Sequence, residues 1–284
     1  MRITRALLLI CLIVPLSPAR AIEPAVDVYA HRGGAGLAPE NTLGAFRQAH
    51  AMFPGVWLEL DTQLAADGEL VVIHDDTLDR TTTNCSGTVM SKTSEQLATC
   101  DARRGWPSWA PFEHVPTLRE VLAEGKTAGW KLLIELKNIP YESNFDPTGA
   151  AVAGALVALL DETGYPAADI GVQSFFPTSL DQIELARPDI ATALLTIGQV
   201  ADQVPGGGFP AASNGAYATA RGYEISAPDH RSIDLSGEVV TAMQASGREV
   251  VVWTVDDPAD IARALAWGVD GIISNRPDRV YAAL

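Results

Sequence analysis

The chain has 284 residues, a formal net charge of −15 and 47% hydrophobic residues. This composition is typical of a globular protein and excludes a disordered chain, and the length fits one barrel domain, which takes about 250 residues. An acidic surface argues against nucleic acid or an anionic membrane as the main partner, because both carry negative charge.

Residues 1–21 have the pattern of a secretory signal peptide. Two arginines precede an apolar run from Ala6 to Val14, and Ala19-Arg20-Ala21 offers small residues at a cleavage position. The run is shorter than the ~20 residues that span a bilayer. We therefore expect no stable membrane anchor, a protein that is exported to the periplasm or secreted, and a mature domain of residues 22–284.

A short apolar strand at residues 26–30 leads into His31-Arg32-Gly33-Gly34, and a helix is predicted from Thr42 to about Ala51. An imidazole titrates near neutral pH, and a guanidinium can bind a phosphate through two parallel hydrogen bonds. The two glycines are expected to let the backbone approach a ligand. Together these residues suit an enzyme that acts on a phosphate ester, although an ordinary polar strand end is the alternative.

The next predicted strand, Trp57–Thr62, places two carboxylates on one face. Side chains alternate along a strand, so Glu59 and Asp61 point the same way, with Trp57. Neighbouring carboxylates repel unless a cation lies between them, and hard ions such as Ca2+ and Mg2+ take oxygen ligands. An exposed acidic edge strand is the alternative, but the apolar neighbours favour a buried strand.

Two further strands add polar residues of the same kind. The short strand Leu70–His74 ends in a second histidine, His74. The strand Lys131–Lys137 supplies a third carboxylate, Glu135, and a second cation, Lys137. These residues extend the prediction from a polar strand end to a cluster of acids, bases and cations.

Nine strand candidates alternate with helices, which favours a parallel sheet or barrel. Helix starts are indicated by the capping box Thr117-Leu118-Arg119-Glu120 and by Asp257-Pro258. We expect Leu70–His74 to lie outside the eight parallel strands. The other candidates are residues 26–30, Trp57–Thr62, Lys131–Lys137, Ile170–Ser174, Ala191–Leu195, Gly222–Ser226, Val250–Thr254 and Gly271–Ser274.

Several separate motifs occur in an order that resembles the glycerophosphodiester phosphodiesterase family. They are His31-Arg32-Gly33-Gly34, Pro39-Glu40-Asn41-Thr42, Glu59-Leu60-Asp61, residues 72–82 (VIHDDTLDRTT), Ile134-Glu135-Leu136-Lys137, residues 172–175 (VQSF), residues 252–255 (VWTV) and residues 269–274 (VDGIIS). The resemblance covers about residues 26–280. It implies a TIM-type (β/α)8 barrel, one divalent cation, and hydrolysis of glycerophosphodiesters to glycerol 3-phosphate and an alcohol.

The resemblance also assigns the cation and phosphate ligands. Glu59, Asp61 and Glu135 are expected to bind the cation, with Ca2+ favoured over Mg2+ because exported enzymes meet it freely, and Arg32 and Lys137 to bind phosphate oxygens. The expected partner is a small-molecule glycerophosphodiester. The sequence leaves the oligomeric state open.

The same resemblance supports an acid–base pair. His31 and His74 are expected to act as general acid and general base, with the assignment between them open. Trp253 is expected to pack against the glycerol carbons, or alternatively in the barrel core. Asn275 stands where an acidic residue is common, which we interpret as a minor change because no proposed role depends on it.

An insertion near residues 80–116 interrupts the alternation of strands and helices. Cys85 and Cys100 follow the predicted signal, and in an oxidising compartment we expect them to form a disulfide; two free thiols are the alternative. The segment resembles the family's insertion, which helps to shape the substrate entrance; for Trp106 and Trp109 we favour packing that pins the loop over a role at that entrance. Residues 204–218, which are rich in glycine, are predicted to form a mobile loop.

Two other functions remain open at this point. A related barrel phospholipase of the D or C type would act on intact lipids and expose an apolar rim, for which Phe175, Phe176, Trp106 and Trp109 are candidates. A non-catalytic phosphodiester-binding protein would lack at least one acid–base or metal residue, and none is missing.

Overall fold

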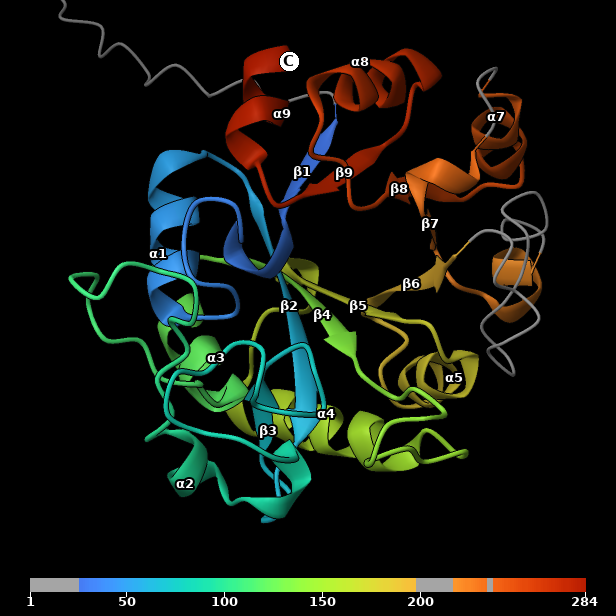
Figure 1. Ribbon diagram of the computed structural model, residues 1–284. Helices are drawn as coiled ribbons and strands as arrows, with labels where there is room; N and C mark the ends of the chain where they lie inside the picture. Colours follow the sequence, from blue (N-terminus) through green and yellow to red (C-terminus); the bar gives the residue numbers. More distant parts are fainter. Residues whose placement is uncertain (1–25, 198–216, 234–236) are drawn as a thin grey trace, which may run out of the picture.

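The computed structural model describes residues 26–197, 217–233 and 237–284. Eight parallel strands pair in the order β1-β9-β8-β7-β6-β5-β4-β2, and β2 returns to β1, so that the sheet closes into a barrel (Figure 1). The predicted TIM-type fold is confirmed. The strands are β1 (Asp27–Ala30), β2 (Trp57–Leu64), β4 (Lys131–Leu136), β5 (Ile170–Ser174), β6 (Ala191–Thr196), β7 (Ile225–Pro228), β8 (Glu249–Val252) and β9 (Gly271–Ser274).

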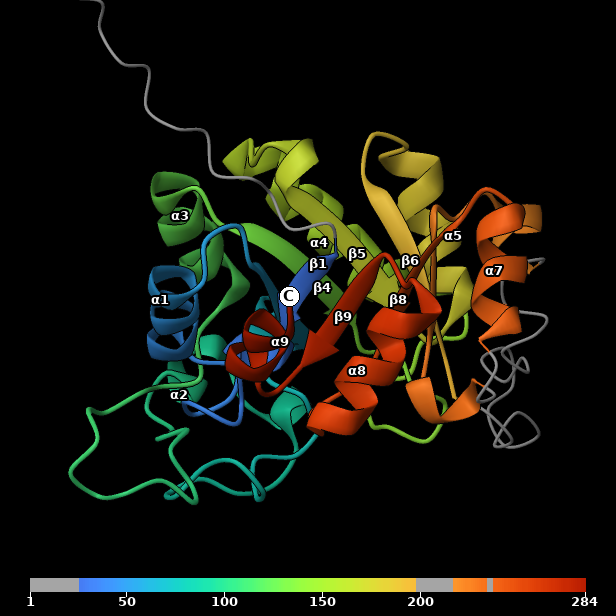
Figure 2. The ribbon, with the colours of Figure 1, turned by 90° about the horizontal axis from the view of Figure 1, so that it is seen from above.

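Helices surround the barrel, as the view along another axis shows (Figure 2). The expected starts are present: Thr42 caps the first helix through Ala45 N, Thr117 and Glu120 form a capping box, and Asp257 caps the helix that opens with Pro258. The helices are α1 (Leu43–Met52), α2 (Ser94–Leu97), α3 (Leu118–Ala128), α4 (Ala150–Thr163), α5 (Pro177–Ala186), α7 (Glu238–Ala245), α8 (Pro258–Trp267) and α9 (Pro277–Ala283), with 3-10 turns η1 (His31–Gly33), η2 (Val89–Ser91), η3 (Ala167–Asp169) and η4 (His230–Ser232).

Apolar side chains fill two separate layers of the barrel. Leu58 and Leu60 of β2 point outward into the core between strands and helices. A smaller core inside the barrel contains Tyr29, Leu133 and Ile273, with the half-buried Trp57 packed against it. Because this inner core plugs the amino-terminal half of the barrel, the inward-facing positions nearer the carboxyl ends of the strands are free for polar side chains.

The strand β3 (Leu70–Val72) pairs antiparallel with β2 and lies outside the eight parallel strands, as predicted. It leads into the insertion, which has its own apolar core around Leu78, Val89 and Leu97. Cys85 and Cys100 are joined by a disulfide, with 5.5 Å between the two Cα atoms. The predicted bridge is therefore present and closes this small core.

Two expectations about loops need correction. Trp109 is 83% exposed, so the packing role expected for the tryptophan pair is wrong for this residue. The strand expected from Gly222 begins instead at Ile225, because Gly222 (φ 94°) lies in a turn in which Tyr223 N donates to Ala218 O. The glycine-rich stretch predicted as a mobile loop lies almost wholly outside the described residues. Within the described residues, no helix has the length and apolar character to cross a bilayer.

Candidate active site

Three carboxylates meet at the carboxyl ends of two adjacent strands. Asp61 of β2 lies directly beside Glu135 of β4 in the sheet register, and Glu59 precedes Asp61 by two residues on the same inward face. One oxygen from each of the three lies within 4.8 Å of the others, and none of the side chains is more than 5% exposed. The period of two along β2 and the parallel pairing with β4 therefore build the predicted cluster.

The burial of these acids sets their charge state. Burial, and then the neighbouring carboxylates, raise the pKa of Glu59 well above its usual range. Burial also raises the pKa of Glu135 despite Lys137 nearby. The pKa of Asp61 moves the other way: burial opposes ionisation, but Lys137, His74 and Arg32 together hold it well below its usual range. The three carboxylates are thus short of positive charge.

This donor set fits a hard divalent cation. Asp61 Oδ1 and Glu135 Oε1 are buried and accept no hydrogen bond; both lie only within ion-pair distance of Lys137 Nζ, at 3.1 and 2.7 Å. All the available ligand atoms are carboxylate oxygens, which Ca2+ and Mg2+ prefer, and no sulfur or imidazole nitrogen belongs to the cluster.

The turn after β1 carries Arg32 into this cluster. Arg32 adopts a left-handed backbone (φ 53°), which directs its N–H to Glu59 Oε2 at 2.7 Å. Its guanidinium lies 3.2 Å from Asp61 Oδ2. The two glycines were expected to let the backbone approach a ligand, but a Cβ on Gly33 would lie 2.8 Å from Ala45 in α1. The glycines therefore allow this turn to pack against the scaffold.

His31 is held in one orientation by a chain of hydrogen bonds. Asn275 donates from Nδ2 to Asp256 Oδ2 at 2.7 Å, so its Oδ1 faces His31 Nδ1, also at 2.7 Å. His31 Nδ1 must therefore carry the proton, which leaves Nε2 with a lone pair, 4.0 Å from Glu59. Burial, and then Arg32, lower the pKa of His31 to about 4. The replacement at Asn275 is consequently not minor, because this residue fixes the tautomer of His31.

His74 is held differently, by a carboxylate. It lies two residues beyond β3, and its Nδ1 is 2.6 Å from Asp75 Oδ1. Arg80 binds the same carboxylate and also Glu40, and Glu40 in turn contacts Arg32 at 3.1 Å. The Nδ1 of His74 thus faces a carboxylate, whereas the Nδ1 of His31 faces a neutral amide oxygen.

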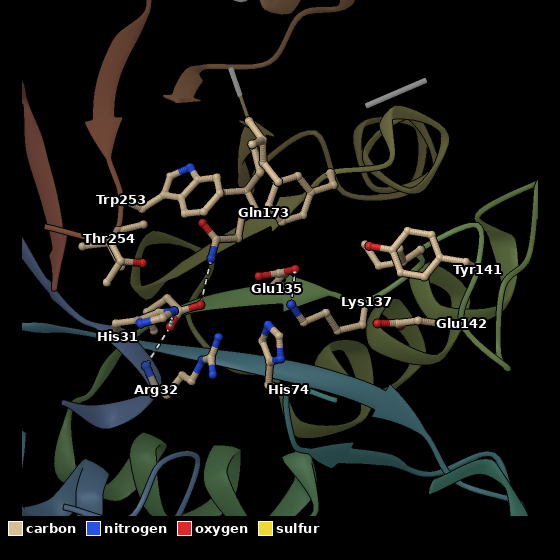
Figure 3. A pocket seen from close by; sticks show the side chains of 16 residues that line it. His31, Arg32, His74, Glu135, Lys137, Tyr141, Glu142, Gln173, Trp253 and Thr254 are labelled. Carbon is tan, nitrogen blue, oxygen red and sulfur yellow. Dashed lines mark hydrogen bonds and ion pairs between the residues drawn. The ribbon is translucent and has the colours of Figure 1, made fainter. Parts of the chain in front are cut away.

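The predicted catalytic, metal-binding and substrate-binding residues, apart from the buried Asp61, line a single cavity of about 270 Å3 at the mouth of the barrel (Figure 3). Figure 3 shows His31 near Trp253 at one side and Lys137, Glu142 and Tyr141 toward the other, with His74 between. The lining residues are His31, Arg32, Glu59, His74, Glu135, Lys137, Ile139, Tyr141, Glu142, Gln173, Phe175, Leu195, Ile197, Trp253, Thr254 and Ile273.

Trp253 lines this cavity and packs edge-to-face on Phe175, with 5.3 Å between the ring centroids. Its indole N–H donates to Ala227 O at 2.7 Å, which fixes the ring. Phe176 is 8% exposed and does not line the cavity, so it cannot belong to the apolar rim suggested for a phospholipase.

Three residues that orient the site were assigned no supporting role from the sequence. Gln173 of β5 donates to Glu59 Oε1 at 2.9 Å, and Asn41 donates to Asp61 Oδ2 at 2.8 Å. Asn275 is the third. Only Gln173 had a usable signal: the alternation along β5 puts it, rather than Ser174, on the inward face, and Ser174 instead donates to Leu136 O outside the cavity.

The fold and the site define a barrel enzyme of phosphate-ester chemistry, and comparisons with known proteins identify its family. The model of the glycerophosphoryl diester phosphodiesterase family matches residues 31–279. The glycerophosphodiester phosphodiesterase of Bacillus altitudinis is 32% identical over 260 residues, which cover 89% of this chain and 95% of the relative. That of Bacillus subtilis is 31% identical over 280 residues, which cover 93% and 86%. The chain belongs to the glycerophosphoryl diester phosphodiesterase family.

Solved structures agree with this assignment. A glycerophosphodiester phosphodiesterase from Agrobacterium tumefaciens superposes with a TM-score of 0.70 at 28% identity, covering 90% of this chain and 99% of that one. A phosphodiesterase from Oleispira antarctica, solved in complex with the product sn-glycerol-3-phosphate, superposes with a TM-score of 0.77 at 25% identity, covering 90% and 96%.

Proposed function

We propose that this enzyme hydrolyses glycerophosphodiesters to glycerol 3-phosphate and an alcohol, using one divalent cation held by Glu59, Asp61 and Glu135. One observation carries the proposal. Two histidines with opposite hydrogen-bonding partners face one cavity, beside a buried cluster of carboxylates that is short of positive charge. Acid–base catalysis needs one proton acceptor and one proton donor, and a phosphodiester needs positive charge next to its oxygens.

His31 is the general base in this proposal. Its Nδ1–H is committed to Asn275, so Nε2 accepts the proton from the attacking water as the water oxygen bonds to phosphorus. A low pKa keeps the imidazole neutral at neutral pH and therefore ready to accept that proton.

His74 is the general acid. Its Nδ1 is oriented by Asp75, and Nε2 donates a proton to the leaving alcohol oxygen as the bond from that oxygen to phosphorus breaks. The proton lost to His31 and the proton supplied by His74 balance over the reaction. Exchange of these protons with water resets the pair.

The phosphate is bound by cations already in the cavity. Arg32 and Lys137 both line it and are oriented by ion pairs to Asp61, so they are preorganised for phosphate oxygens. A bound divalent cation supplies further neutralisation of a phosphate oxygen and makes a hydroxyl group more acidic. Trp253 offers an apolar ring face for the glycerol carbons.

The identity of the ion and the location of the enzyme belong to the same proposal. We favour Ca2+ over Mg2+, because residues 1–21 have the pattern of a signal peptide and exported proteins meet free Ca2+. Export is supported by that pattern and by the disulfide, which forms in oxidising compartments. Intact-mass measurement of the exported protein tests cleavage after Ala21.

The decisive assay measures glycerol 3-phosphate released from glycerophosphocholine and glycerophosphoethanolamine, and phosphatidic acid or diacylglycerol released from intact phospholipid as a third substrate. Each is tested after chelation and after readdition of Ca2+ or Mg2+. Release from the two soluble diesters that needs an added ion supports the proposal. Hydrolysis of intact lipid alone would favour the phospholipase function, for which the exposed ring of Trp109 and the cavity-lining Phe175 are the structural arguments.

A further inference from the structure

One acidic side chain in the cavity has no part in the mechanism above. Three carboxylates line the cavity, and two of them, Glu59 and Glu135, belong to the cation cluster. The third, Glu142, lies on the loop after β4, and no Lys, Arg or His among the described residues forms an ion pair with it. A negative charge beside a phosphate site is unfavourable unless it faces a positive charge of the substrate.

Building on the proposed function, we propose that Tyr141 and Glu142 bind the cationic head group of zwitterionic glycerophosphodiesters, namely a choline or ethanolamine group. The enzyme then prefers these substrates to diesters with a neutral or anionic alcohol. Both residues line the cavity and lie side by side at the end remote from His31 (Figure 3).

A hydrogen bond from the buried Gln63 holds the carboxylate of Glu142 in place. Gln63 of β2 is 1% exposed, and its Nε2 donates to Glu142 Oε2 at 3.3 Å and to the backbone oxygen of His74 at 3.1 Å. The same loop is anchored where Ser143 N donates to Asp76 Oδ2 at 3.1 Å. Glu142 is therefore tied to the strand that carries the cation ligands and to the segment that carries His74.

The local charge favours a cation at this end of the cavity. Burial raises the pKa of Glu142, with a contribution from the nearby Asp76, and together they outweigh the opposite effects of Gln63 and Lys137. Asp76 is likewise without an ion-pair partner in the described part of the chain. Lys137, which is also paired with Asp61 and Glu135, and His74 act on Glu142 in the opposite direction to Asp76. A substrate ammonium group beside Glu142 and Asp76 would be attracted by both carboxylates.

Tyr141 adds an aromatic face to the same end. Its side chain is 79% exposed although it borders the cavity, which is unfavourable for a large ring that faces water. A quaternary ammonium group binds well to the face of a tyrosine ring, and a carboxylate beside the ring increases that attraction. An alcohol without positive charge gains neither contact.

The position of His74 in the cavity indicates that the head group extends toward Glu142 and Tyr141. His74 protonates the leaving alcohol oxygen, so the alcohol must extend along the side of the cavity that His74 borders. Beyond His74 the cavity continues past Lys137 to Glu142 and Tyr141, whereas Trp253 lies at the opposite side, toward His31 (Figure 3). The leaving alcohol is the part of the substrate that carries choline or ethanolamine.

The test compares kcat/KM for glycerophosphocholine with kcat/KM for glycerophosphoglycerol, whose leaving alcohol has no positive charge. We expect the Glu142→Gln variant, which keeps a hydrogen-bond acceptor for Gln63, to lower the ratio of the two values about three- to tenfold. Glu142→Lys lowers it further, and Tyr141→Ala lowers it by a smaller factor. The matched control is Glu95→Gln on α2, an exposed acid outside the cavity and without an ion pair among the described residues; its ratio equals that of the unmodified enzyme.

Binding to the His74→Ala variant separates this proposal from the proposed function. Calorimetry gives the dissociation constants of both diesters for His74→Ala alone and with Glu142→Gln. A selective loss of glycerophosphocholine affinity supports the head-group site even if the unmodified enzyme hydrolyses neither diester, which would overturn only the proposed function. Equal losses for both diesters, or no loss, overturn the head-group site even if hydrolysis is rapid.

Discussion

The mouth of the barrel and the insertion at residues 80–116 lie side by side but are built in opposite ways. The mouth gathers buried charges from strand ends far apart in the sequence, such as Arg32, Glu135 and Asn275. The insertion has a local apolar core closed by the Cys85–Cys100 bridge, and the aromatic rings of Trp109 and Phe112 are exposed to solvent. We infer that activity depends on the mouth and stability in part on the insertion, so that mutations can separate the two.

Removal of the cation should have the largest effect. Chelation is expected to abolish hydrolysis, and Ca2+ or Mg2+ to restore it, because three clustered carboxylates repel the phosphate when no cation neutralises them. Glu59→Gln and Asp61→Asn should reduce metal content, measured by atomic emission, more than they reduce the melting temperature. Full activity after exhaustive chelation would contradict the proposed cation site.

Replacement of either histidine should come next. His31→Ala and His74→Ala are each expected to lower kcat by about a hundredfold or more, the usual scale for general acid–base groups. Circular dichroism should show an intact fold, because both side chains border the cavity rather than the core. His50, on α1 and outside the cavity, provides the matched control as His50→Ala. Near-normal turnover in either site variant removes that histidine from the mechanism.

Replacement of Asn275, the hydrogen-bond partner of His31, should have a smaller effect on the rate, and this effect should depend on pH. Asn275→Ala is expected to lower kcat about tenfold, because the ring loses the bond that fixes its tautomer. Asn275→Asp places a carboxylate beside Nδ1, which raises the pKa of His31 above its low value in the present protein. Since the base must be neutral, the acidic limb of kcat/KM moves to higher pH. An unshifted limb in Asn275→Asp would show that His31 is not the titrating base.

Removal of the disulfide should have the smallest effect on turnover. The Cys85→Ser, Cys100→Ser double variant is expected to lose about 3 kcal/mol of stability, as the chain-entropy model gives for a loop of this length, while keeping most of its turnover. Thermal melts and steady-state kinetics on the same preparation measure both. Lost turnover with unchanged stability would show that the insertion is part of the active site, and the contrast between the two regions would fail.

Short-range periodicity predicted the barrel strands and the acidic face of the site. A repeat of two along β2 placed Glu59 and Asp61 on one face, and each strand that ended in polar residues marked the carboxyl end of the barrel. Capping residues gave the starts of α1, α3 and α8. The strand ends were less accurate, as at Gly222, because a turn residue can stand inside an apolar run.

Tertiary structure decided how the site residues are held. Nothing near Asn275 in the sequence indicates that it contacts a residue 244 positions away, and the proposed role of His31 as base depends on that contact. The same holds for Asn41 on Asp61 and for Gln63 beneath Glu142. The sequence by itself determined the barrel, the three carboxylates and the two histidines, because alternation along a strand is a local property of the chain. Only closure of the barrel decided charge states, tautomers and the shape of the cavity on which the proposed head-group site depends, because these follow from burial and from neighbours that the chain brings together from distant strands.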